Sequence, residues 1–348
     1  MNRTMKKLVN EAVASQYFSF FVTVILFLAL YVIGVMSYNG FMQPQVFLNL
    51  FIDNAALIIV TVGITFTLLI GGIDLSVGAV VALCCMILAY LLEHTAIPVV
   101  AAVAGVLLLG IVIGGIQGYL ITAFDMQPFI ITLAGMFFCR GLTAVISRET
   151  ISITNPFYVS IASERIDVGV GFISIGAVVA LFGLVIAAIV LKYTKFGRTV
   201  FAIGGNENSA SLMGLPVFKT KICVYVISGF CAALGGVVYS WIMLSGYTLH
   251  GLGMEMDAIA SSVIGGTLLT GGVGFIPGTL FGVLIQGVIL TFITFQGTLS
   301  AWWTKIVIGA LLCVFIIMQA IITERKKKMS SKSSMESGNA EHAASAKS

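Results

Sequence analysis

The sequence predicts an all-α, polytopic membrane protein of about ten transmembrane helices with an internal repeat. Apolar residues make up 59% of the 348 residues and charged residues only 9%, whereas about 25% of the residues of an average soluble domain are charged. The apolar residues form continuous runs of about twenty, the length that crosses a bilayer as a helix. A β-barrel is excluded because its strands would be short segments of alternating polarity.

Ten apolar runs are expected to be membrane helices. They cover residues 18–37, 52–70, 77–92, 97–121, 129–147, 171–191, 222–241, 258–270, 277–295 and 303–323. The first run is too long for a signal-peptide core, so we expect it to remain as an uncleaved helix. The eighth run is short enough to be broken or re-entrant.

Basic residues indicate the orientation of the chain. Fourteen of the eighteen lysines and arginines lie in residues 1–7, 192–221 and 324–347. An even number of predicted helices separates these segments, so all three would lie on one side of the bilayer. The positive-inside rule makes that side cytoplasmic and places residues 148–170 and 242–257 outside.

The expected organisation follows from this orientation. Residues 1–17 form a cytoplasmic N-terminus, and residues 18–323 form the membrane domain with a cytoplasmic loop at 192–221. Residues 324–348 are polar and of low complexity, so we expect a disordered cytoplasmic tail.

An internal repeat is visible at an offset of 200 residues. TLLIGGIDLSVG begins at Thr67 and TLLTGGVGFIPG at Thr267. Duplicated halves are common in transporters; the helix count makes these copies parallel, and one re-entrant segment between them would make them inverted. The glycines of the two motifs are expected at hinges or tight packing contacts, and they are Gly71, Gly72, Gly78, Gly271, Gly272 and Gly278.

Two rows of glycines at helical spacing predict close helix–helix contacts. One row is Gly110, Gly114 and Gly118, and the other is Gly274, Gly278 and Gly282. Glycines spaced in this way allow helix backbones to approach each other.

Asp74 stands between two apolar runs, where a carboxylate costs about 2.5–3.5 kcal/mol. In a structural interpretation, Gly71 and Gly72 end one helix, and Asp74 or Ser76 caps the next. In a functional interpretation, Asp74 lies on a polar path or at a gate. The sequence leaves both open.

A short capped helix is predicted in the cytoplasmic loop. Asn206 suits an N-cap, Glu207 suits the first turn, and Gly214 suits the position after the helix, with Pro216 as a stop. Apolar residues on a helix without a core of its own indicate a docking element; a helix lying on the membrane surface is the alternative. The expected contact residues are Asn206, Glu207, Ser209, Ala210, Leu212, Met213 and Gly214.

Polar residues within the predicted helices are few and mostly uncharged. Hydroxyl and amide groups suit a neutral, hydroxyl-rich solute, although each could merely bond a neighbouring backbone carbonyl. The candidate pathway residues are Asp74, Ser76, Thr65, Gln117, Thr132, Phe137, Ser261, Ser262 and Gln286.

Signatures of enzymes are missing from the sequence. It contains no G-x4-G-K-[ST] phosphate loop, no paired carboxylates and no metal-type cysteine or histidine spacing, so we expect no catalytic residue, no metal site and no bound cofactor. The six cysteines lie in apolar runs and are expected to be packing residues.

Three motifs resemble the permease subunits of bacterial ribose-type sugar ABC importers. They are GGIDLSVG, FAIGGNENSASLMGL and DAIASSVIGGTLLTGGVGFIPGTLFG. FIITLAGMFFCRG (129–141) and GTLSAWWTKIVIG (297–309) are most similar to one of the two permeases of the galactofuranose importer. The resemblance covers about residues 41–319.

This resemblance implies a multi-pass protein of the bacterial inner membrane that moves a sugar by alternating access. It implies a homologous second permease, in a heterodimer, a cytoplasmic ATPase that binds ATP and magnesium, and a periplasmic sugar-binding protein. The loop helix at 206–214 would dock on the ATPase. No nucleic-acid partner is expected.

Two other functional classes remain open. An ion-coupled secondary transporter of a small polar solute would need carboxylates in broken helices, and Asp74 is the sole candidate. A channel or a structural membrane protein would not need a docking helix.

Overall fold

The structure, a computed structural model, describes residues 18–297 and 302–319. The helices of these segments are α2 (Phe18–Ser37), α3 (Pro44–Asp53), α4 (Ala55–Leu69), α5 (Val77–His94), α6 (Val99–Ala123), α7 (Pro128–Ile146), α8 (Pro156–Ser163), α9 (Ile175–Tyr193), α10 (Lys195–Gly205), α11 (Glu207–Leu212), α12 (Val217–Met243), α13 (Met254–Ile264), α14 (Ile276–Gln296) and a last helix, Trp302–Gln319. The strands are β1 (Ile151–Ser152), β2 (Arg165–Asp167), β3 (Phe172–Ser174) and β4 (Ser245–Gly246).

The prediction of an all-α membrane protein is confirmed. Eight described helices are long and apolar enough to cross a bilayer, and the bent pair α3–α4, with an angle of 53°, makes a ninth. The remaining predicted segment, the eighth (258–270), corresponds to α13, whose eleven residues reach only about 16 Å at 1.5 Å per residue. It is therefore about half as long as the hydrocarbon core is thick.

The second predicted helix begins earlier than the sequence indicated. The apolar run suggested a start at residue 52, but α3 begins at Pro44, and a break at Asn54 separates it from α4. The Asn54 side chain donates a hydrogen bond to the carbonyl of Leu50 at 2.8 Å. A polar residue at this point thus marks a bend within one span rather than the loop before it.

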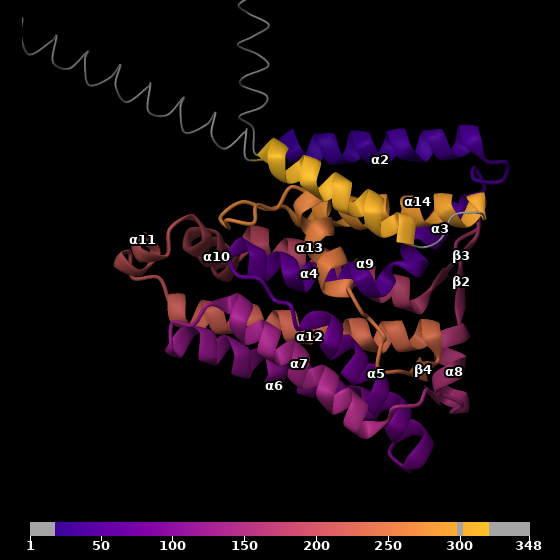
Figure 1. The fold of residues 1–348 in the computed structure, drawn as a ribbon, viewed down its shortest axis with the longest axis horizontal. Helices are drawn as coiled ribbons and strands as arrows, with labels where there is room; N and C mark the ends of the chain where they lie inside the picture. Colours follow the sequence, from indigo (N-terminus) through magenta and orange to yellow (C-terminus); the bar gives the residue numbers. More distant parts are fainter. Residues whose placement is uncertain (1–17, 298–301, 320–348) are drawn as a thin grey trace, which may run out of the picture.

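The long helices run roughly side by side, with α12 in the middle (Figure 1). α12 packs against α4, α5 and α6, while α2, α14 and the last helix lie on one side of the molecule and α6 and α7 on the opposite side (Figure 1). Buried residues of α5, α6 and α12 form one apolar core, and those of α4, α9 and α12 form a second. A third core joins α2, α14 and the last helix.

The two ends of the molecule differ in structure. α10 and α11 lie at one end, together with the start of α2 and the end of the last helix (Figure 1). The opposite end carries α8 and the short strands. There β1 pairs antiparallel with β4, with Ile151 opposite Gly246, so the two loops that were expected outside the membrane are joined to each other.

The first glycine row packs α6 onto α12. A Cβ atom at Gly110 would overlap the carbonyl of Gly229, and one at Gly114 would overlap the carbonyl of Tyr225. In the second row, Gly278 and Gly282 face Gly265 and Ser261 of the α13 segment. Gly274 lies in the connection before α14, so the helical row contains two glycines and not the three that the spacing predicted.

We expect Gly110→Ala to destabilise the protein, whereas Gly105→Ala on the same helix has little effect. The added methyl at position 110 meets backbone that cannot move aside, and such overpacking costs about 1–3 kcal/mol. No atom outside the local backbone lies within 4 Å of a Cβ at Gly105. Thermal unfolding of both variants in detergent measures the difference, and equal melting temperatures would contradict the close α6–α12 contact.

Candidate functional site

The predicted loop helix is α11, and its ends are capped as the sequence indicated. The Asn206 side chain accepts a hydrogen bond from the Ser209 amide at 2.7 Å, and Gly214 has a φ of +75°. That left-handed conformation is one glycine adopts without strain. The Glu207 carboxylate forms an ion pair of 2.8 Å with Lys221 of α12, which fixes α11 to the membrane domain.

The apolar residues of α11 are divided between two environments. Leu212 is 90% exposed and Met213 is 68% exposed, as a docking surface requires. Ala210 is fully buried, so the expectation that it belongs to the exposed surface was wrong. The reason is tertiary: Ala210 is on the side of α11 that faces its own chain, where its carbonyl also accepts the Leu215 amide at 3.1 Å.

Three backbone segments meet where α10 ends, just before α11. The Gly272 amide donates a hydrogen bond to the Leu69 carbonyl at 2.9 Å, which joins the glycine turns of the two repeats. Gly204 of α10 packs directly on both, because a Cβ at this position would overlap the Leu69 carbonyl and the Gly272 amide nitrogen. We call this three-way contact of Leu69, Gly204 and Gly272 the glycine junction.

The segments that lead into the two glycine turns run in the same direction. Thr65 and Ser262, which lie just before the two copies, are in contact, and further along both segments Leu69 binds Gly272. Contacts that advance together along both segments indicate a parallel arrangement at this point. Gly71 and Gly271 lie in this contact, whereas Gly78 faces Glu255 and Gly251 and Gly278 faces Gly265.

Asp74 is 1% exposed and accepts three hydrogen bonds. Its Oδ1 accepts the amide of Ser76 at 2.9 Å and the Ser76 hydroxyl at 2.7 Å, and its Oδ2 accepts the Ser228 hydroxyl at 2.7 Å. Asp74 thus holds the start of α5 against α12. Of the two capping residues that the sequence offered, Ser76 makes no side-chain cap on the described α5, because its hydroxyl is turned toward Asp74, whereas Asp74 accepts the backbone amide of Ser76.

Gln117 and Thr132 extend this polar cluster. The Gln117 Oε1 lies 3.2 Å from the Ser76 hydroxyl, and the Thr132 hydroxyl lies 3.1 Å from the Ile73 carbonyl. The structure therefore brings four of the predicted pathway residues together, with Ser228 as the partner of Asp74.

Thr65 and Ser262 form a second, separate polar cluster. Their hydroxyls are 3.0 Å apart, and the Thr279 hydroxyl lies 3.2 Å from that of Thr65. Ser261 is fully buried nearby on α13. All of these hydroxyls are buried where α4, α13 and α14 meet, and none of them lines the cavities described below.

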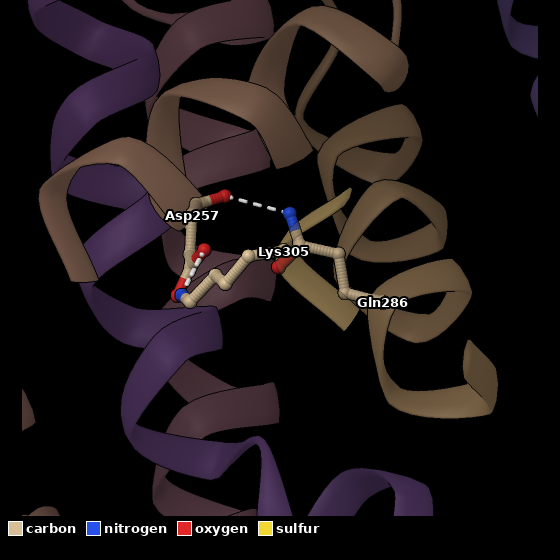
Figure 2. Close-up of polar contacts among 3 residues, drawn as sticks. All are labelled: Asp257, Gln286 and Lys305. Carbon is tan, nitrogen blue, oxygen red and sulfur yellow. Dashed lines mark hydrogen bonds and ion pairs between the residues drawn. The ribbon is translucent and has the colours of Figure 1, made fainter. Parts of the chain in front are cut away.

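Two predicted pathway residues lie apart from both clusters. Phe137 is 65% exposed on the outer surface of α7. The Gln286 amide donates to the backbone carbonyl of Asp257 at 2.9 Å, while Lys305 bonds the Asp257 carboxylate at 2.7 Å (Figure 2). Gln286 therefore takes part in a contact that joins α13, α14 and the last helix.

Arg140 of α7, which had no identifiable partner in the sequence, holds a connecting loop. Its guanidinium donates to the carbonyls of Thr248 and His250, both at 2.7 Å. Burial lowers the pKa of His250, and the nearby Arg140 charge lowers it further. His250 is therefore neutral near pH 7.

Cavities lie at the end that carries α10 and α11. One of about 250 Å³ lies between Gly71, Gly72, Asp125, Glu207 and Tyr225. Another, of about 630 Å³, lies beside α9 and includes Gly272 in its wall. The larger cavity therefore borders the glycine junction through Gly272, whereas the smaller one is lined by the turn that follows Leu69.

Sequence reasoning missed Gly204, Ser228 and Tyr225 as site residues. The Gly204–Gly205 pair directly before the capping Asn206 was a local signal that pointed to a close backbone contact. Ser228 and Tyr225 lie on a helix without local features, and their proximity to Asp74 follows only from the packing of α12.

Comparison with known proteins agrees with this architecture. The family model of the branched-chain amino acid transport system permease component matches residues 46–316. The chain belongs to this family of permeases. As an ABC transporter permease component it is not itself an enzyme.

Individual relatives match along most of their length. The chain is 46% identical over 303 residues to the inner membrane ABC transporter permease protein YjfF of Escherichia coli, which covers 87% of this chain and 92% of that protein. It is 38% identical to the fructose import permease protein FruG of Bifidobacterium longum over 86% and 89% of the two chains. It is 35% identical to the ribose import permease protein RbsC of Bacillus subtilis over 87% and 91%. No solved structure matches the chain.

We expect Asp74→Asn to retain most of the stability and transport of the permease, and Asp74→Leu to lose both. An asparagine oxygen still accepts hydrogen bonds, and a serine hydroxyl can donate or accept. Leucine leaves the Ser76 amide and the Ser228 hydroxyl without the acceptor that Asp74 supplies, at about 1–3 kcal/mol for each buried group. Melting temperature and solute uptake in vesicles measure the effect; equal losses in both variants would instead show that the charge is required.

We expect Gly204→Ala to impair transport by the permease, whereas the adjacent Gly205→Ala does not. The Gly204 methyl would separate α10 from both glycine turns, while a Cβ at Gly205 has no such neighbour within 4 Å. Uptake in vesicles should fall strongly for Gly204→Ala at normal membrane abundance. Full uptake by this variant would show that the glycine junction is ordinary packing.

Proposed function

We propose that the chain is the permease subunit of a bacterial ABC importer that moves a monosaccharide across the inner membrane. A docked ATPase would pull on α11, and the movement would shift the permease between outward-open and inward-open states. ATP and magnesium are bound by the ATPase, and no cofactor is bound by this chain. This function rests on the family membership and on one feature of the structure, the connection of α11 to both repeats.

The connection of α11 supports this coupling role. α11 presents exposed Leu212 and Met213 and is tied back to α12 by the Glu207–Lys221 ion pair. The last turn of α10, directly before α11, contains Gly204, which packs on Leu69 and Gly272. A displacement of α11 is therefore applied directly to the turns that follow α4 and α13. A helix that merely lay on the membrane would need no such backbone contact.

A sugar is the proposed substrate class. The three relatives above include proteins named for fructose and ribose import, and the resemblance at 129–141 and 297–309 favours galactofuranose or a similar monosaccharide. Neutral hydroxyl and amide groups dominate the buried polar clusters, which suits a neutral, hydroxyl-rich solute. In the conformation described, these groups bond one another, so an open pathway would require α4, α5, α12 and α13 to separate.

An ion-coupled mechanism gains no support from Asp74. Its carboxylate accepts three hydrogen bonds within the chain and is 1% exposed. A coupling ion would have to compete with these three donors for the carboxylate oxygens.

The proposed assembly contains three further proteins. They are a homologous second permease in a heterodimer, the cytoplasmic ATPase at α11, and a periplasmic sugar-binding protein at the end that carries α8 and β1–β4. In this orientation both chain termini are cytoplasmic, as are residues 1–17 and 324–348. The chain has several candidate membrane spans, and the inner membrane is the proposed location, which the Escherichia coli relative's name gives for that protein.

We expect Leu212→Asp to abolish docking of the ATPase, while Leu212→Met preserves it. A charge at this position is unfavourable against an apolar partner surface, and loss of an interface anchor reduces affinity roughly 30-fold or more. Methionine keeps an apolar side chain of similar size. Co-purification of the ATPase with the permease and uptake in vesicles are the measurements.

The outcome separates docking from folding. Both variants should reach the membrane in normal amounts, since position 212 is almost fully exposed. Retention of the ATPase and full uptake by Leu212→Asp would refute the docking role of α11.

A further inference from the structure

A deep groove beside α9 has no role in the proposed coupling mechanism. Its volume is about 630 Å³, and it lies between Phe20 of α2, the second half of α9, the start of α10 and the connection from α13 to α14. Most of its walls are apolar, and the side chains that form them include Phe20, Leu184, Ala188, Ile189, Phe275 and Pro277. We call it the α9 groove.

The groove has the depth of one bilayer leaflet. It extends along α9 from Leu184 to Tyr193, which is about 13 Å at 1.5 Å per residue. Half of a hydrocarbon core of about 30 Å is about 15 Å. Val185, Ile189 and Tyr193 are each more than half exposed, so the groove opens to whatever surrounds α9 in the membrane.

Two basic residues stand at one end of the apolar walls. Lys192 and Arg198 both line the groove, and both are exposed. Within residues 18–297 and 302–319 the ion pairs are Lys221–Glu207 and Lys305–Asp257, so neither cation is paired there. The Lys192 ammonium lies 5.4 Å from the centre of the Tyr193 ring. These residues lie at the end that carries α10 and α11, where a bilayer has its headgroups.

The α9 groove combines apolar walls with two unpaired cations at the headgroup level. Such a groove is complementary to a molecule with an apolar chain and an anionic head. We propose that the α9 groove binds one anionic phospholipid, with an acyl chain against α9 and its phosphate between Lys192 and Arg198. Basic pockets between membrane helices on the cytoplasmic side are known to bind anionic headgroups in this way. Burial of the acyl chain adds to the charge attraction.

Segments of this chain are poor candidates for the same place. Residues 1–17 contain Arg3, Lys6 and Lys7 against a single acid, Glu11, and residues 320–348 contain six basic and three acidic residues. Either segment would bring positive charge to two cations. A second copy of the chain would likewise oppose its own Lys192 and Arg198 if it met this face symmetrically.

Because the groove lies beside the glycine junction, a bound lipid is expected to affect coupling. Residues Gly272 to Pro277 form one wall, and the Gly272 amide is bonded to Leu69 in the glycine junction. A bound lipid would support this wall, so transport should depend on anionic lipid. This consequence rests on the proposed function, whereas the binding itself does not.

The test counts bound phosphatidylglycerol in the full-length permease. Wild type, Lys192→Gln/Arg198→Gln and the control Lys195→Gln/Lys219→Gln are purified in mild detergent after exchange into a mixture of phosphatidylglycerol and phosphatidylcholine. The control removes equal charge from the same end of the molecule, and neither of its residues lines the groove. Native mass spectrometry measures bound lipid and oligomeric state together.

We expect wild type and control to retain about one phosphatidylglycerol per chain and the groove variant to lose it. Each basic residue near the surface contributes about 1 kcal/mol, so removal of both should weaken binding roughly 30-fold. Added inorganic phosphate should not displace the lipid, because phosphate lacks the acyl chain.

Three results would overturn the proposal. One is equal phosphatidylglycerol retention by the groove variant and the wild type. Another is that the wild type retains as much phosphatidylcholine as phosphatidylglycerol, which would show a site without charge selectivity. The third is a change of oligomeric state without loss of lipid, which would identify the face as a contact with another permease. None of these readouts depends on the transported substrate, so failure here is distinguishable from failure of the proposed function.

Discussion

The hydrogen bond from the Gly272 amide to the Leu69 carbonyl, at 2.9 Å, is the contact on which the rest of the account depends. It joins the two glycine turns of the repeat, and it can form only because no side chain stands between their backbones. Gly204 fits against the same two atoms and brings the end of α10, directly before α11, into the contact. The short surface helix α11, for which a docking role is proposed, is thereby connected to the interior of the membrane domain through backbone rather than through flexible side chains.

The buried polar groups show how such a domain can have discrete states. Asp74 with Ser228 and Thr65 with Ser262 each connect helices that are distant in sequence. In hydrocarbon, a group that loses its hydrogen bond finds no water to replace the lost partner. The polar groups of each cluster must therefore either keep these hydrogen bonds or exchange them for others within the protein. Packed interfaces of this kind favour switching between alternatives over gradual deformation.

Much of the architecture could be predicted because its causes are local. Long apolar runs predicted nearly all of the spans, and Asn206 as an N-cap together with Gly214 predicted α11. What could not be predicted depends on tertiary packing. Ala210 is buried because it lies on the side of α11 that packs against the rest of the chain. Phe137 is exposed because it lies on the side of α7 that faces away from the other helices. The bond between Asp74 and Ser228 joins residues 154 positions apart, which no local pattern reports.

Hydrogen exchange at the Gly272 amide tests the central claim most directly. The full-length permease, with its ATPase bound in lipid nanodiscs, would be followed by mass spectrometry of peptides that contain this residue, with and without nucleotide. If the glycine junction transmits movement as one unit, the amide stays protected in both states, like the amides of a core helix. Exchange at the rate of an exposed loop in either state would show that the two turns separate, and it would contradict the account.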